Sequence, residues 1–192
     1  MNRAVFLDKD GTLIEDVPYN VEVDRIRLCE GVASLRSLHQ VGYKLIVISN
    51  QSGVARGYFP ETALVNVEQR LAELLGVPLS GFYYCPHHPD GTVAEFAIEC
   101  DCRKPKAGLL QRAAQDHQID LARSWFIGDI LNDVEAGRAA GCRTILIDNG
   151  NETEWILTRS RLPDHVVANL TEAARIVAAI DQPVQAQLAL SL

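Results

Sequence analysis

The chain has 192 residues, of which 47% are hydrophobic and 22% are charged, as in a globular protein with one well-packed domain. Its formal net charge of −7 argues against a large basic face, so we expect no nucleic-acid partner. No apolar run approaches the roughly 20 residues of a membrane span, and the first apolar residues lead into Asp8 instead of a signal peptide. We therefore expect a cytoplasmic monomer that binds no membrane.

Helical and strand patterns alternate along the chain, which is typical of one parallel sheet covered by helices on both faces. The sequence therefore predicts a single three-layer, doubly wound α/β fold. We expect strands over residues 4–7, 43–48, 82–84, 124–127 and 143–147. We expect helices between residues 31 and 42 and over 60–75, 108–117, 132–140 and 170–180. One domain then spans 1–181, and the tail, 182–192, stays unassigned.

Polar side chains follow three of the expected strands. The first strand runs into two carboxylates one residue apart, Asp8 and Asp10, which could also form a surface turn held by an Asx-type hydrogen bond. The second strand runs into residues 49–51, and the fourth runs into Asp129. Because ligands bind beyond the carboxyl ends of parallel strands, these ends predict one shared site. About thirty residues separate the first two strands, which leaves no room for a large cap domain.

These residue types suit phosphoryl transfer. A carboxylate that attacks phosphorus is repelled by the phosphate oxygens, so the reaction needs cations. Asp8 and Asp129 could hold Mg²⁺, and Lys104 could supply a second positive charge. Ser49 and the backbone amides after it could donate hydrogen bonds to the phosphoryl oxygens. Asp10 would protonate the leaving oxygen and later deprotonate the attacking water.

The same residues fall into four short motifs. In chain order these are Asp8-Lys9-Asp10-Gly11-Thr12, Ser49-Asn50-Gln51, Lys104 and Gly128-Asp129-Ile130-Leu131-Asn132-Asp133. Together they resemble the motifs of haloacid dehalogenase-like phosphatases, in order and over most of the chain. The resemblance implies that Asp8 is the nucleophile, that Asp10 is the acid and base, and that Asp8, the Asp10 carbonyl and Asp129 hold Mg²⁺. Asp133 could pair with Lys104, hold a metal-bound water, or begin a helix.

Three of the five cysteines lie close together beside histidines, which favours a metal site over disulfides in a chain without a secretion signal. Segments 50–57, 85–89 and 100–105 resemble a narrower family, the D-glycero-D-manno-heptose 1,7-bisphosphate 7-phosphatases. That resemblance implies four zinc ligands: Cys85, His87, Cys100 and Cys102. Three thiolates and one imidazole would fill a tetrahedral site, so the zinc would be structural. The alternative is a group of small buried thiols beside a surface histidine.

The narrower resemblance also implies the residues that contact the substrate. They are Asp16, Val17, Pro18, Tyr19, Asn50, Gln51, Ser52, Arg103 and Lys104. Because Arg103 and Lys104 directly follow Cys102, a metal in this loop would hold both cations in place. The match departs from the family at Ile130, where a lysine is often found, and this leaves the exact sugar and its anomer open.

The sequence thus predicts a Mg²⁺-dependent phosphatase with a structural Zn²⁺. Its substrate would be a small phosphorylated sugar, D-glycero-D-manno-heptose 1,7-bisphosphate, which loses its 7-phosphate through an aspartyl-phosphate on the route to cell-envelope lipopolysaccharide. Histidinol-phosphate phosphatases share a similar zinc loop, and DNA 3′-phosphatases share a similar Asn-Gln stretch, although the acidic charge disfavours the latter. A zinc-stabilised interaction module without turnover is the alternative from a different class.

Overall fold

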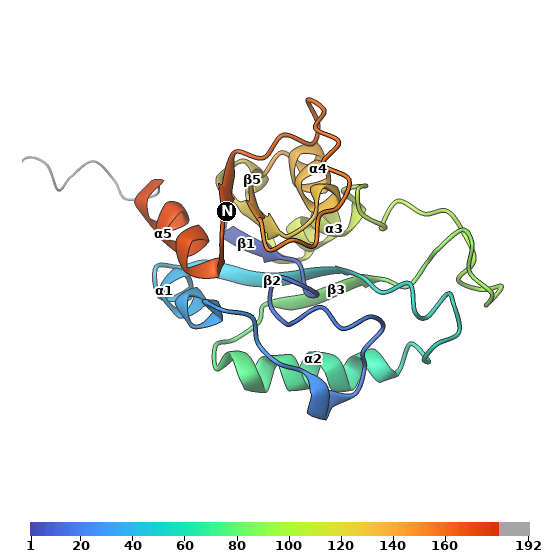
Figure 1. Ribbon diagram of the computed structural model, residues 1–192. Helices are drawn as coiled ribbons and strands as arrows, with labels where there is room; N and C mark the ends of the chain where they lie inside the picture. Colours follow the sequence, from blue (N-terminus) through green and yellow to red (C-terminus); the bar gives the residue numbers. More distant parts are fainter. Residues whose placement is uncertain (181–192) are drawn as a thin grey trace, which may run out of the picture.

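The computed structural model describes residues 1–180, so the tail that the sequence left unassigned, 182–192, lies outside the described residues. Six parallel strands form one sheet in the order β3-β2-β1-β4-β5-β6 (Figure 1). Their bounds are β1 (Arg3–Leu7), β2 (Tyr43–Asn50), β3 (Gly81–Cys85), β4 (Trp125–Gly128), β5 (Arg143–Ile147) and β6 (His165–Val167). The chain order reverses between β1 and β4, which is where doubly wound sheets bind ligands.

Helices cover both faces of the sheet, as predicted. Their bounds are α1 (Leu35–Gln40), α2 (Ala63–Leu75), α3 (Gly108–His117), α4 (Leu131–Ala140) and α5 (Leu170–Ile180). Alternate residues of β1 face opposite layers: Val5 and Leu7 pack with α1, α2 and α5, whereas Ala4 and Phe6 pack with α3 and α4. Figure 1 shows α2 on one side of the sheet and α3 with α4 on the other. None of the helices in the described part of the chain could span a bilayer.

The sequence missed strand β6. It has three residues, of which Val167 is buried and Val166 is 54% exposed, at the edge of the sheet. So short an edge strand buries too few side chains to produce an apolar pattern. The helix expected between residues 31 and 42 is also divided, because residues 32–34 form a 3-10 turn before α1 begins.

The two segments that join the first three strands contain helices but no further sheet. Between β1 and β2 the chain forms two 3-10 turns, Val23–Arg25 and Val32–Ser34, followed by α1. Between β2 and β3 it forms α2, whose apolar stripe packs on the sheet and which ends at Gly76 in the left-handed conformation. Within residues 1–180, therefore, no large cap domain covers the carboxyl ends of the strands.

Candidate active site

A buried ion-pair cluster lies where β1, β2 and β4 end. The Lys104 ammonium is 2.5 Å from Asp8 Oδ1 and 2.6 Å from Asp133 Oδ1. Asp129 directly follows β4 and is also buried. The structure thus brings together three predicted site residues, Asp8, Lys104 and Asp129, which lie far apart in the sequence.

The cluster carries more negative than positive charge. One oxygen from each of Asp8, Asp129 and Asp133 lies within 4.8 Å of the others, and Lys104 pairs with Asp8 and Asp133. Burial raises the pKa of Asp8 well above its usual range despite the opposing effect of Lys104. Burial, and then the Asp133 charge, raise the pKa of Asp129 to about 6. A hard cation with a preference for oxygen ligands would relieve this repulsion, so the donor set fits a divalent metal.

Lys104 remains charged in this environment. Burial acts to lower the pKa of Lys104, but the carboxylates of Asp133 and Asp8 outweigh it and raise the pKa above its ordinary value. Asp133 also accepts a hydrogen bond of 3.3 Å from the Ile130 N–H at the start of α4. Two of the alternatives that the sequence left open for Asp133, pairing with Lys104 and beginning a helix, are therefore both correct.

Two glycines allow the carboxylates to approach the backbone. A Cβ atom at Gly11 would lie 2.0 Å from Asp129 Oδ2, and Gly11 also has a positive φ of +79°. A Cβ atom at Gly128 would lie 2.2 Å from Asp133 Oδ2. Both contacts are too short for any side chain, which explains why glycine accompanies the aspartates in the first and last motifs.

Ser49 is connected to Asp10 through the side-chain amide of Gln51. Gln51 Nε2 donates to Ser49 Oγ at 2.8 Å and to Asp10 Oδ2 at 3.1 Å. The side chain of Asn50 instead binds the backbone of Lys104: its Oδ1 accepts from the Lys104 N–H at 3.0 Å, and its Nδ2 donates to the Lys104 carbonyl at 3.2 Å. The second motif therefore connects Asp10 to Ser49 and holds the lysine of the third motif.

The segment after β5 supplies residues that the sequence analysis missed. Asn151 Nδ2 donates to Asp129 Oδ2 at 2.7 Å, and Asn149 Nδ2 donates to the Gly11 carbonyl at 2.7 Å. Thr12 Oγ1 lies 3.3 Å from Asp129 Oδ1. The sequence carries a signal for these positions, because polar residues also follow the fifth expected strand, 143–147.

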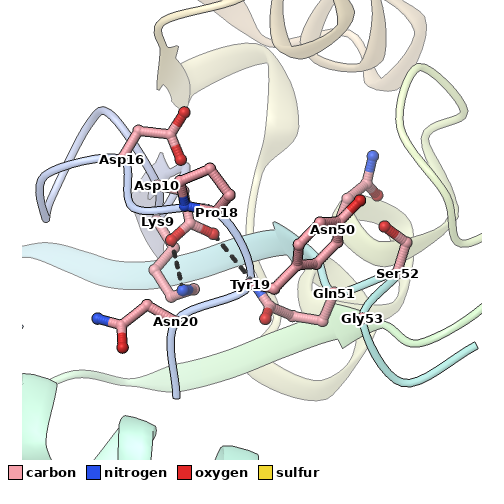
Figure 2. A pocket seen from close by; sticks show the side chains of 10 residues that line it. All are labelled: Lys9, Asp10, Asp16, Pro18, Tyr19, Asn20, Asn50, Gln51, Ser52 and Gly53. Carbon is pink, nitrogen blue, oxygen red and sulfur yellow. Dashed lines mark hydrogen bonds and ion pairs between the residues drawn. The ribbon is translucent and has the colours of Figure 1, made fainter. Parts of the chain in front are cut away.

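A cavity of about 250 Å³ opens beside Asp10 (Figure 2). Its lining residues are Lys9, Asp10, Asp16, Pro18, Tyr19, Asn20, Asn50, Gln51, Ser52 and Gly53. Most of the predicted substrate residues are among them, but Val17 is not. Arg103 and Lys104 instead line a neighbouring cavity of about 290 Å³ together with His88. Apart from Val17, which lines neither, the residues predicted to contact the substrate are therefore divided between two cavities.

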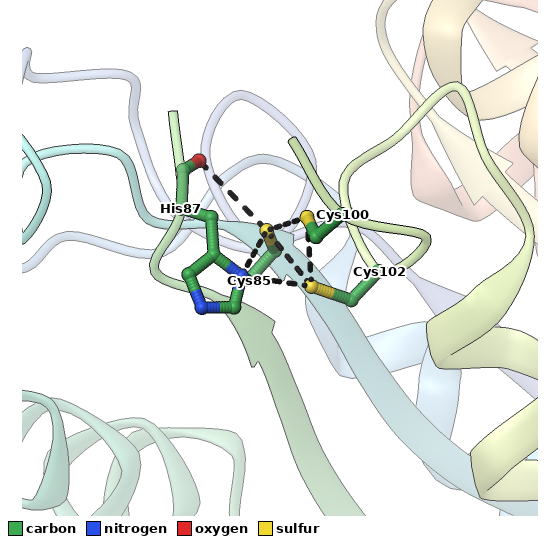
Figure 3. Close-up of side chains that lie close together, drawn as sticks. All are labelled: Cys85, His87, Cys100 and Cys102. Atoms are coloured by element: carbon green, nitrogen blue, oxygen red, sulfur yellow. Dashed lines mark hydrogen bonds between the residues drawn. The ribbon is translucent and has the colours of Figure 1, made fainter. Parts of the chain in front are cut away.

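The four predicted zinc ligands form a second cluster (Figure 3). Cys102 Sγ lies 3.1 Å from the Sγ atoms of Cys85 and Cys100, and His87 Nδ1 lies 3.3 Å from Cys102 Sγ. The hydrogen bond between Cys85 and Cys102 lowers the pKa of Cys102 to about 5 and raises the pKa of Cys85. Three sulfurs and one nitrogen around one point fit a tetrahedral metal such as zinc.

Comparisons with known proteins agree with this geometry. A family model for HAD-hydrolase-like proteins matches residues 101–173. Two curated proteins named D-glycero-beta-D-manno-heptose-1,7-bisphosphate 7-phosphatase are similar to the chain. The one from Haemophilus ducreyi is 46% identical over 154 residues, which cover 77% of this chain and 84% of the relative. The one from Escherichia coli is 41% identical over 167 residues, which cover 80% and 87%.

A solved structure is also similar. The D,D-heptose 1,7-bisphosphate phosphatase from B. bronchiseptica, crystallised with magnesium and phosphate, superposes with a TM-score of 0.76 at 26% identity. The match covers 93% of this chain and 99% of that one. The parallel sheet, the carboxylate cluster at its switch point and these similarities define a haloacid dehalogenase-like phosphatase, a phosphoric monoester hydrolase. More narrowly, the chain belongs to the family of D-glycero-β-D-manno-heptose-1,7-bisphosphate 7-phosphatases.

Proposed function

We propose that the protein is a Mg²⁺-dependent phosphatase that removes the 7-phosphate of D-glycero-D-manno-heptose 1,7-bisphosphate through an aspartyl-phosphate on Asp8. The observation that carries the proposal is the buried Asp8 carboxylate, 2.5 Å from the Lys104 ammonium and beside two further buried carboxylates. The names of the relatives support the choice of substrate.

In the proposed reaction, an oxygen of Asp8 attacks phosphorus while the bond from phosphorus to the sugar oxygen breaks. Asp10 gives its proton to that leaving oxygen. Ser49 and Lys104 bind the phosphoryl oxygens, and Asp10 then takes a proton from the water that hydrolyses the aspartyl-phosphate. Asp8, Asp129 and the Asp10 carbonyl would hold Mg²⁺, which neutralises charge on the phosphoryl group when bound.

We further propose that Cys85, His87, Cys100 and Cys102 hold a structural Zn²⁺. Support comes from the donor set, which leaves a tetrahedral ion no open position for a substrate. Such an ion would act indirectly, because it would fix the loop that carries the two cations after Cys102.

Phosphate release from a substrate panel tests the assignment. The panel contains heptose bisphosphate, histidinol phosphate and a 3′-phosphorylated oligonucleotide, each with Mg²⁺ and with a chelator. We expect the highest kcat/KM for heptose bisphosphate, and loss of that activity with the chelator. A preference for histidinol phosphate would overturn the substrate, and no release from any member would favour the interaction-module alternative.

Mg²⁺ affinity should depend on pH through Asp129. Because its pKa is raised to about 6, a proton competes with the metal below that pH. The apparent affinity should therefore fall by up to about tenfold for each pH unit below 6. Calorimetric titrations with Mg²⁺ above and below pH 6 measure whether the affinity falls as the pH falls. An affinity that rises as the pH falls would exclude Asp129 as a ligand.

Asn151→Ala should weaken Mg²⁺ binding by about tenfold at pH 7. The hydrogen bond from Asn151 acts to lower the pKa of Asp129, so its loss makes proton competition stronger and also releases the carboxylate from its orientation. The matched control is Asn2→Ala, which removes an exposed asparagine whose Nδ2 donates to the His117 carbonyl before β1, at the end of that strand opposite Asp8. Equal Mg²⁺ affinities for the two variants would contradict the positioning role of Asn151.

Tyr58→Ala should raise KM by about three- to tenfold with little change in kcat. The Tyr58 and Tyr19 rings meet edge to face with centroids 4.6 Å apart, and Tyr19 lines the cavity with a positive φ of 56°. Loss of the Tyr58 ring removes the support for Tyr19 without touching Asp8 or Asp10. Tyr58→Phe keeps the ring and should retain the original KM. A large fall in kcat for Tyr58→Ala would refute this account.

A further inference from the structure

Lys9 is a buried cation that the mechanism above does not use. Within the described residues, Lys9 and Lys104 are the two buried lysines, and each pairs with a predicted catalytic aspartate. The Lys9 ammonium lies 2.6 Å from Asp10 Oδ1, and its side chain is 2% exposed. Burying an ammonium is costly, whereas an apolar side chain would fill the same space without that cost. Packing alone therefore does not explain why a charged side chain occupies this position.

The backbone at Lys9 is fixed by the turn that follows β1. The N–H groups of Leu13 and Ile14 both donate to the Lys9 carbonyl at 3.0 Å, and Gly11 N–H donates to the Ile14 carbonyl at 2.8 Å. Figure 2 shows the Lys9 side chain beneath Asp10 at the wall of the cavity. A rigid backbone and a buried stem hold the ammonium in one position before any substrate arrives.

Asp10 is held from both sides. Lys9 binds Oδ1, while Gln51 Nε2 binds Oδ2 at 3.1 Å and also donates to Ser49 Oγ. Two donors on different oxygens fix the plane of a carboxyl group, which a single hydrogen bond does not. The Asp10 side chain is still 31% exposed and lines the cavity, so the fixed group faces the space where a substrate would bind.

We propose that Lys9 is a positioning residue for proton transfer: its ammonium fixes the Asp10 carboxyl group so that it faces first the leaving oxygen and then the attacking water. This inference rests on the proposed function, because it takes Asp10 as the acid and base. In the first step the Asp10 proton passes to the sugar oxygen as the P–O bond breaks. In the second step the Asp10 carboxylate takes a proton from the water that attacks phosphorus, and Asp10 returns to its starting form.

Phosphorylation of Asp8 and hydrolysis of the aspartyl-phosphate can be measured separately. p-Nitrophenolate leaves without a proton, so an aryl phosphate can phosphorylate Asp8 without help from Asp10. Hydrolysis of the aspartyl-phosphate still needs Asp10 as a base. A variant with a misplaced Asp10 should therefore release one p-nitrophenolate per active site quickly and then turn over slowly.

Lys9→Met tests the proposal in the full-length protein loaded with Mg²⁺. We expect kcat for heptose bisphosphate to fall by about 100-fold with KM changed by less than about threefold. Stopped-flow mixing with p-nitrophenyl phosphate should show a burst close to one equivalent. Lys9→Arg, which keeps a cation, should restore kcat to within about tenfold. Equal kcat for the Met variant and the wild type, or an equal loss for both substrates without a burst, would overturn the proposal.

Gln51→Leu provides a second test of the proposal if Lys9→Met does not fold. Gln51→Leu removes the donor from the other oxygen of Asp10 and keeps Lys9, so it should give the same burst. Its absence in a folded, active Gln51→Leu protein would also count against the proposal. Failure of the proposed function has a different signature, because the wild type itself would then release no phosphate from the panel.

Discussion

Asp8→Asn is expected to lower kcat for phosphate release by at least about 10⁴-fold, because it removes the nucleophile and keeps its shape. The fold should survive the change. Burial raises the pKa of Asp8, so its ionised form costs stability at neutral pH, and a neutral amide does not carry that cost. Lys104 keeps its partner Asp133 at 2.6 Å. The metal-free variant should therefore melt within a few degrees of the wild type, by scanning calorimetry.

Asp133→Asn is the matched control for Asp8→Asn. Both aspartates are buried and both bind the same ammonium, so each substitution removes one charge from the same cluster. Asp133 is not placed to attack a substrate in the proposed mechanism, and its variant should keep measurable turnover. Activity of Asp8→Asn within about tenfold of the wild type would mean that another carboxylate is the nucleophile.

The sequence predicted the parts of this fold that bury long apolar segments. Residues Ala4 to Leu7 are fully buried between two helical layers, so nothing polar interrupts their strand pattern. β6 escaped prediction because an edge strand with an exposed Val166 has no such pattern. The carboxylates were predictable for a related reason: a charge at the end of a buried strand has few structural explanations other than a site.

Lys104 was a candidate cation from the chemistry, but no pattern in the sequence places it beside Asp8. It lies 96 residues after Asp8, outside any helix or strand, and its position depends on the side chain of Asn50 and on the loop around it. The role of Lys9 was hidden for another reason. It stands between two aspartates whose side chains explain the motif, and the direction of a side chain in a turn does not follow from residue spacing. Asn151 and Tyr58 likewise act through contacts between distant segments.

Cys102→Ser is expected to remove most of the bound zinc and to lower the melting temperature by about 10 °C. Residues 86–107, all of which the structure describes, contain no helix or strand, and the ligand cluster joins residues 100–102 of this long loop to Cys85 at the end of β3. Metal analysis and calorimetry measure both effects. Cys29→Ser is the control, because Cys29 is half-buried and outside the cluster. Full zinc occupancy in Cys102→Ser would remove Cys102 from the set of ligands.

The kinetic effect of Cys102→Ser should fall on KM more than on kcat. Lys104 is held independently of the cluster, since Asn50 binds its backbone and two aspartates bind its ammonium. Arg103 donates to the His87 carbonyl at 3.4 Å, and His87 belongs to the same metal loop. Loss of zinc should therefore displace Arg103 and leave Lys104 in place. We expect KM for heptose bisphosphate to rise at least about tenfold while kcat changes by less than about fivefold. A fall in kcat at constant KM would show that the metal loop supports the chemical step instead of substrate binding.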